Sequence, residues 1–244
     1  MNNWNDFNEN GYQTAVQAEN EMTLQRYVAG VMRKVYGKMT LGLLLTALTS
    51  YLLINSDVAQ TLMFAKPAIM WILMAAELGL VIWLSAGINK LSTTAATLMF
   101  FLYSVLTGAS LTPIFYVYTS ASIAKTFAIT SFTFGAMTVF GYTTRQDLSK
   151  FGSILIMALI GLIACVLVNV VFFQSSMFDL VISIVGVFIF IGLTAWDTQS
   201  IKRMCAEGDP SMMGKVATMG ALSLYLDFIN LFIYLLRFFG SSRS

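Results

Sequence analysis

Seven apolar stretches of about 20 residues follow one another along the chain, and this is the length that a helix needs to cross the hydrocarbon of a bilayer. Unpaired backbone cannot face lipid, so a helix is the structure expected for each stretch. The alternating segments that mark a membrane β-barrel are absent from the sequence. The sequence therefore predicts an all-α membrane protein, a seven-transmembrane helix bundle. Its expected spans are about 36–55, 68–88, 92–117, 122–142, 152–173, 178–200 and 216–239.

The composition excludes a soluble enzyme, and we expect no enzymatic activity. Only 11% of the residues are charged and 57% are hydrophobic, whereas roughly a quarter of a soluble domain is charged. The chain has no histidine, so a pH response near neutrality has to come from carboxyl groups. The net charge of +2 gives no reason to expect a nucleic-acid partner, and no pattern predicts a cofactor. Cys165 in a predicted span and Cys205 in a predicted loop are not expected to form a disulfide.

The chain divides into a polar N-terminal segment and one transmembrane domain. Residues 1–25 lack the basic start and apolar centre of a signal peptide, and we expect them to form a mobile tail. Residues 26–244 form the transmembrane domain. It begins with a basic amphipathic stretch that we expect at the membrane surface, with Arg26, Arg33, Lys34 and Lys38.

Basic residues predict which end of the bundle is cytosolic, because loops on the cytosolic side carry an excess of lysine and arginine. The loops after the second, fourth and sixth spans carry Lys90, Arg145, Lys150, Lys202, Arg203 and Lys215. The alternate loops carry only Lys66 and Lys125. The N-terminus is therefore expected in the cytosol and the C-terminus outside, although Arg237 and Arg243 near the C-terminus weaken the asymmetry slightly.

Three acidic residues fall inside predicted spans: Glu77, Asp197 and Asp227. A charged aspartate at the centre of a membrane helix costs about 2.5–3.5 kcal/mol on insertion scales. Each acid must therefore face the bundle interior, carry a proton or find a partner. A neutral acid hydrogen-bonded to a neighbouring helix is the plain structural alternative for each of them.

The last predicted span carries a polar stripe on one helix face. Ser223, Asp227, Asn230 and Tyr234 are spaced by four, three and four residues in ALSLYLDFINLFIYLLRFFG. Such a stripe lines either a helix contact or a water path, and hydrogen-bonded packing alone stays open as an explanation.

The preceding span ends in GLTAWDTQSIK, where Asp197 follows Thr194 by about one helical turn. A short loop joins the two spans, so they are expected to be antiparallel neighbours with both aspartates at comparable depth in the inner half of the membrane. If the two carboxyl groups meet, they will not both ionise and will share a proton. The protonated pair would hold the helices together, and the ionised pair would repel and admit a cation.

These motifs resemble those of the Bax inhibitor-1 (TMBIM) family. The similarity lies in ALSLYLDFINLF with LRFFG, in the WDTQ end of the sixth span, and in FGYTTRQDLSKFGSIL after the fourth. The resemblance implies a bacterial inner-membrane bundle whose seventh span is central. It further implies a pH-sensitive calcium leak, with calcium as the transported ion. It assigns the gating pair to Asp197 and Asp227 and matches Glu77 to an acidic position of the second span. The oxygens of Asp197, Asp227, Ser223 and Asn230 are not expected to form a high-affinity calcium site.

The chain departs from the family pattern at two positions. Trp196 stands where tyrosine usually precedes the aspartate, and the stretch LSAGINK offers only Lys90 where relatives have a basic cluster that latches the sixth-span aspartate. Looser gating is therefore expected. Separately, Pro113 should kink the third span.

Three other functions stay open. The chain could be a non-transporting regulator with membrane-protein partners, in which case the polar stripe is packing. An intramembrane aspartyl protease is disfavoured, because Leu-Tyr-Leu precedes Asp227 and the Gly-x-Gly-Asp and Pro-Ala-Leu motifs are missing. A proton-coupled solute transporter is disfavoured because the spans show no inverted repeat.

Overall fold

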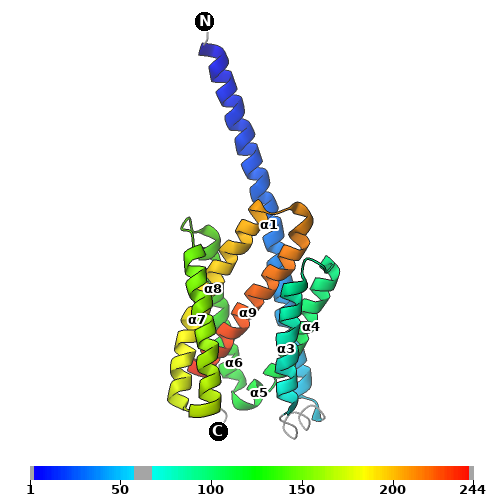
Figure 1. Ribbon diagram of the computed structural model, residues 1–244, viewed down its shortest axis with the longest axis vertical. Coiled ribbons are helices and arrows are strands. Elements are labelled where there is room, and N and C mark those ends of the chain that lie inside the picture. The colour runs from blue at the N-terminus through cyan, green and yellow to red at the C-terminus, as the bar shows by residue number, and fades with distance from the viewer. Residues whose placement is uncertain (1–2, 58–67, 242–244) are drawn as a thin grey trace.

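The computed structural model describes residues 3–57 and 68–241, and the regular elements of these residues are helices (Figure 1). Seven of the helices are long and apolar enough to cross a membrane, which confirms the predicted fold class. In chain order the elements are α1 (Asn3–Ile54), α3 (Ala68–Gly87), α4 (Thr93–Leu111), α5 (Ile114–Val117), α6 (Ser120–Thr143), α7 (Ser149–Val168), the π-helix η1 (Asn169–Phe173), α8 (Ser176–Glu207), the 3-10 helix η2 (Pro210–Met212) and α9 (Met213–Phe239).

The long helices run up and down, so the two termini lie at opposite ends of the bundle (Figure 1). The connections α3–α4, α6–α7 and α8–α9 lie at the same end as the point where α1 enters the bundle. We call this the N-terminal end. It carries the basic loops from which the cytosolic side was predicted, and the orientation itself stays a prediction. Lys66 and Arg243 lie outside the described residues.

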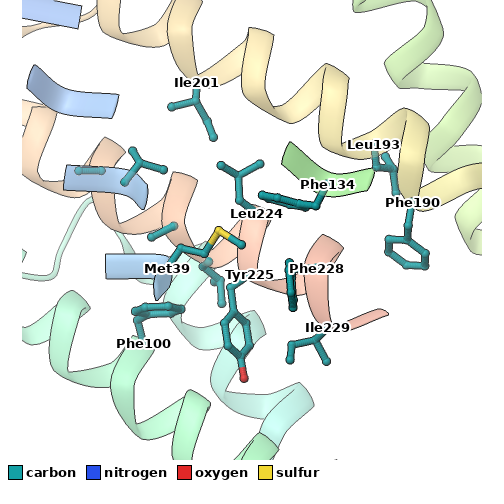
Figure 2. Packing of buried hydrophobic residues seen from close by; sticks show 14 of the residues in the cluster. Met39, Phe100, Phe134, Phe190, Leu193, Ile201, Leu224, Tyr225, Phe228 and Ile229 are labelled. Atoms are coloured by element: carbon teal, nitrogen blue, oxygen red, sulfur yellow. The ribbon is translucent and has the colours of Figure 1, made fainter. Parts of the chain in front are cut away.

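Helix α9 is the centre of the bundle, as predicted. In the most apolar 18 residues of its span, 67% of the residues are buried, compared with 6% in α3 and 11% in α7. It packs on α8, α1, α6 and α4. Figure 2 shows Leu224, Tyr225 and Phe228 of α9 among buried side chains of the surrounding helices. Small residues allow this close packing: Gly220, for example, lies against Ile201 of α8.

Helix α1 is longer than the predicted first span and begins at Asn3. Its N-terminal part projects beyond the bundle (Figure 1), and the mobility expected for residues 1–25 stays a prediction. The basic stretch does not form a separate helix along the membrane surface. Val28, Val31, Met32 and Val35 recur at helical spacing and are buried in the core, which draws this part of α1 into the bundle.

The third span has the kink that Pro113 predicted, and the sixth span is longer than predicted. The third span is broken at Pro113: α4 ends at Leu111 and the short α5 begins at Ile114, because proline lacks an N–H and its ring clashes with the preceding turn. Helix α8 continues past the predicted end at 200 to Glu207. Cys205 therefore lies buried on its last turns and not in a loop; both it and the exposed Cys165 are free thiols.

Candidate functional site

A cavity of about 850 Å³ lies beside α9 and gathers the acidic residues of the membrane-spanning helices. Its lining comes from α3, α4, α7, α8 and α9. Glu77, Asp197 and Asp227 all line it, and so do the other members of the α9 stripe, Ser223, Asn230 and Tyr234. The polar stripe therefore faces a cavity and is not closed off by helix packing.

Asp197 of α8 and Asp227 of α9 lie within hydrogen-bonding reach of each other. The Asp227 side chain is only 4% exposed, and its Oδ2 has no hydrogen-bond partner among the described residues. An ionised carboxylate can only accept hydrogen bonds, so a bond between two carboxyl groups requires a proton on one of them. The antiparallel α8–α9 hairpin produces this contact, since the short connection at η2 returns the chain along its own path.

Glu77 enters the cavity from α3, on the opposite side from α8. It is half-buried, lies within hydrogen-bonding reach of Ser110 of α4, and has an Oε1 atom without a partner in the described part of the chain. Tyr103 of α4 lines the same wall. The cavity thus carries carboxyl groups contributed by three different helices.

Two predicted site residues lie elsewhere. Thr194 is fully buried and donates its hydroxyl to the carbonyl of Phe190 at 2.7 Å; it does not line the cavity. A threonine hydroxyl satisfied within its own helix needs no outside partner. Lys90 is exposed in the α3–α4 turn, and the described contacts include no ion pair between it and Asp197.

The WDTQ motif holds the α6–α7 loop, a role that the sequence did not reveal. Gln199 accepts from the backbone N–H of Leu148 at 2.8 Å and donates to the carbonyl of Gln146 at 2.8 Å. Arg203, one turn further, forms an ion pair with Asp147 at 2.8 Å. The guanidinium of Arg203 holds the pKa of Asp147 well below its usual range. We call these interactions the loop contact; the pairing of the WDTQ and RQDLS motifs was its only sequence signal.

Buried hydroxyls hold α9 to α1 and α4. Lys38 of α1 donates to Thr218 of α9 at 2.6 Å and to Thr97 of α4 at 2.8 Å. The Tyr225 hydroxyl of α9 is hydrogen-bonded to Thr46 of α1 at 2.6 Å. The sequence signal for these bonds was Lys38, a lysine at the start of an apolar span, which was expected at the membrane surface.

Comparison with known proteins agrees with this architecture. The family described as "Inhibitor of apoptosis-promoting Bax1" matches residues 28–244. The chain belongs to the Bax inhibitor-1 family. It is 49% identical to "Inner membrane protein YbhL" of Escherichia coli (strain K12) over 223 residues, which cover 90% of this chain and 93% of that protein. An uncharacterized protein of Borreliella burgdorferi is 45% identical, with 87% of this chain and 92% of that protein covered.

Membership in the Bax inhibitor-1 family confirms the resemblance seen in the sequence, and the chain is a multi-pass protein of a bacterial inner membrane. An uncharacterized protein of Rickettsia prowazekii extends the set at 43% identity, covering 91% of this chain and 92% of that protein. The name of the Escherichia coli relative gives its location and no transported ion.

Proposed function

We propose that this Bax inhibitor-1 protein is a pH-regulated cation leak, with calcium as the ion, gated by Asp197 and Asp227. The observation that carries the proposal is the contact of these two carboxyl groups in one cavity among the membrane-spanning helices. No catalytic step, resident cofactor or nucleic-acid partner forms part of the proposal.

The shared proton is the proposed switch. With the proton in place, the pair links α8 to α9 and the path stays closed. When the proton is lost, two negative charges face each other in a medium of low dielectric and repel, which separates the helices. The groups that face the pair are Glu77 of α3, Tyr103 of α4 and Tyr234 of α9, and none of the residues lining the cavity is a lysine or an arginine. The ionised site is thus left without a fixed counter-ion and favours a mobile cation.

The oxygen donors suit transient passage better than storage. Calcium takes about six to eight oxygen ligands. Asp197, Asp227, Ser223 and Asn230 offer six oxygens only if both carboxylates bind through both of their oxygens, which is the low end of that range. A calcium ion would keep part of its water while it passes.

Calcium flux into proteoliposomes between about pH 5 and pH 8 tests the proposal, with wild type beside Asp197→Asn and Asp227→Asn. An amide cannot release the shared proton, so both variants should lose the pH dependence that wild type shows. Glu207→Gln, at the exposed end of α8, is the matched control and should behave as wild type. Unchanged pH dependence in Asp227→Asn would refute the sensor role.

A second candidate is a non-transporting regulator that binds other membrane proteins. It is favoured by the largely uncovered spans of α3 and α7, whose most apolar parts are 6% and 11% buried and offer faces to a partner helix. The aspartate pair would then be a buried structural contact. Purified protein that moves no calcium at any pH would support this candidate over the leak.

A further inference from the structure

The acidic cavity opens sideways, toward lipid. Met74 and Leu78 of α3 line it and are 53% and 63% exposed, and Ile156 and Ile163 of α7 line the other edge and are 41% and 53% exposed. All four lie in the middle of membrane-crossing helices. An exposed apolar residue at this depth faces hydrocarbon. The mouth between α3 and α7 is therefore in contact with the bilayer interior.

The arrangement of the helices explains this mouth. Helix α3 packs mainly on α4, and α7 packs mainly on α8. Figure 1 shows α3 and α7 on either side of α9, which crosses obliquely behind them. The wall opposite the mouth is the polar face of α9, with Ser223, Asp227 and Asn230. A molecule that enters from the lipid thus reaches the buried acids directly.

The acids select the charge of such a molecule. Asp227 lines the cavity and is only 4% exposed. Its Oδ2 has no hydrogen-bond partner among the described residues. Oε1 of Glu77 is likewise without a partner there. An ammonium group has three donors and no acceptor, and charge-assisted hydrogen bonds to carboxylates are among the strongest in proteins.

We propose that the cavity binds a long-chain primary amine from the bilayer, with its ammonium group on Asp227 beside Asp197 and its alkyl chain passing out between α3 and α7. The inference rests on the proposed function only in sharing its cavity and its acid pair; ion transport is not required. Moving an alkyl chain from lipid to an apolar wall gains little, because both surroundings are apolar. Recognition therefore depends on the head group, and the neutral alcohol of the same chain length should not compete.

Photolabelling of the whole protein in lipid nanodiscs provides the test. The probe is dodecylamine carrying a diazirine on its alkyl chain, and labelled peptides are mapped after irradiation. We expect labels on α3 and α7 near Leu78 and Ile156, displaced by dodecylamine and not by dodecanol or dodecanoate. Labelling elsewhere, or equal displacement by dodecanol, would overturn the proposal. Both readings use wild type alone, so they do not depend on whether a variant folds.

Variants of the acids add a second measurement. Asp227→Asn should weaken displacement by dodecylamine about tenfold or more, which is the loss expected for one charge-assisted contact. Glu77→Gln should weaken it less, and Glu207→Gln should leave it unchanged. Wild-type affinity in Asp227→Asn would contradict the assignment.

The two proposals at this cavity fail separately. Amine binding without calcium flux keeps this inference and removes the leak. Flux whose pH dependence is lost in Asp227→Asn, without specific amine labelling, keeps the leak and removes this inference.

Discussion

The contact between α1 and α4 at Gly108 allows a quantitative prediction about what holds these two helices together. Gly108 is buried between the two helices, and a Cβ atom added there would lie 2.6 Å from the Thr46 carbonyl oxygen and 2.7 Å from Thr49 Cβ. Ordinary contact begins at 3.4 Å, so the oxygen would have to withdraw by roughly 0.8 Å, the difference between 3.4 and 2.6 Å. Backbone on a packed helix cannot move this far alone, and the helices must separate.

Separation would weaken the hydrogen bonds that cross this contact. Ser50 donates to the Gly108 carbonyl at 2.6 Å, and Thr46 donates to the Ser104 carbonyl at 2.9 Å. Two such bonds between membrane helices contribute about 0.6 kcal/mol each, and overpacking costs about 1–3 kcal/mol. The higher helix propensity of alanine offsets this loss of stability by up to about 1 kcal/mol. Gly108→Ala should therefore lower the free energy of unfolding by about 1–3 kcal/mol.

Gly135→Ala on α6 is the matched control, because nothing lies within 4 Å of a Cβ atom added there. It should be neutral or stabilise by up to about 1 kcal/mol. Reversible unfolding in mixed micelles with increasing dodecyl sulfate measures both variants. Equal stabilities for the two variants would refute the reasoning, since helix propensity is the same in each and only the contact differs.

Two further predictions concern the surface and the core. Arg203 lowers the pKa of Asp147, so the stability that their ion pair contributes is complete above the ordinary pKa of 3.8 and is lost only as the pH falls below it. The difference in thermal unfolding between Asp147→Asn and wild type should therefore be the same at about pH 5 and pH 8. A difference that disappears at pH 5 would contradict this. Tyr225→Phe removes the 2.6 Å bond to Thr46 but leaves Thr46 its carbonyl acceptors, so the same micelle titration should show a loss of about 1 kcal/mol and not the larger cost of an unpaired buried group.

Hydropathy alone predicted the spans because every membrane helix must satisfy its backbone internally, whatever surrounds it. The α9 stripe was also predictable, since helical spacing places Ser223, Asp227, Asn230 and Tyr234 on one face whatever that face contacts. Periodicity does not report partners distant in the chain. Gln199 and Leu148 are 51 positions apart, and Lys38 and Thr218 are 180 apart.

Thr194 and Lys90, two further residues named from the sequence, do not line the cavity, and the reasons are related. Thr194 has the right spacing from Asp197, but its hydroxyl is satisfied by its own helix. Lys90 has the right charge but lies on an exposed turn. Spacing and charge identify a candidate residue, and the direction of its side chain is decided by packing, which a single sequence does not display.

The side-chain hydrogen bonds between α1, α4 and α9 form one group, and those that hold α8 to α6 and to the α6–α7 loop form another. Lys38 joins α1, α4 and α9, and Thr46 adds α1–α9 and α1–α4 bonds. On the other side, the loop contact holds α8 to the α6–α7 loop, and Lys202 of α8 donates to the Tyr142 carbonyl of α6 at 2.7 Å. Asp227 belongs to the first group and Asp197 to the second. Repulsion between them therefore acts across the contact between α8 and α9.

The boundary between the two groups is bonded at the C-terminal end of the bundle. The backbone N–H of Ser241, just after α9, donates to Ser122 of α6 at 2.9 Å, and the N–H of Thr119 donates to the Ser241 carbonyl at 3.2 Å. These bonds connect the two groups just beyond the end of α9, at the opposite end of the bundle from the loop contact (Figure 1). At the N-terminal end, the short connection at η2 joins α8 directly to α9. Both ends of the boundary are therefore held, and repulsion between the ionised aspartates should separate α8 from α9 between them, beside the cavity.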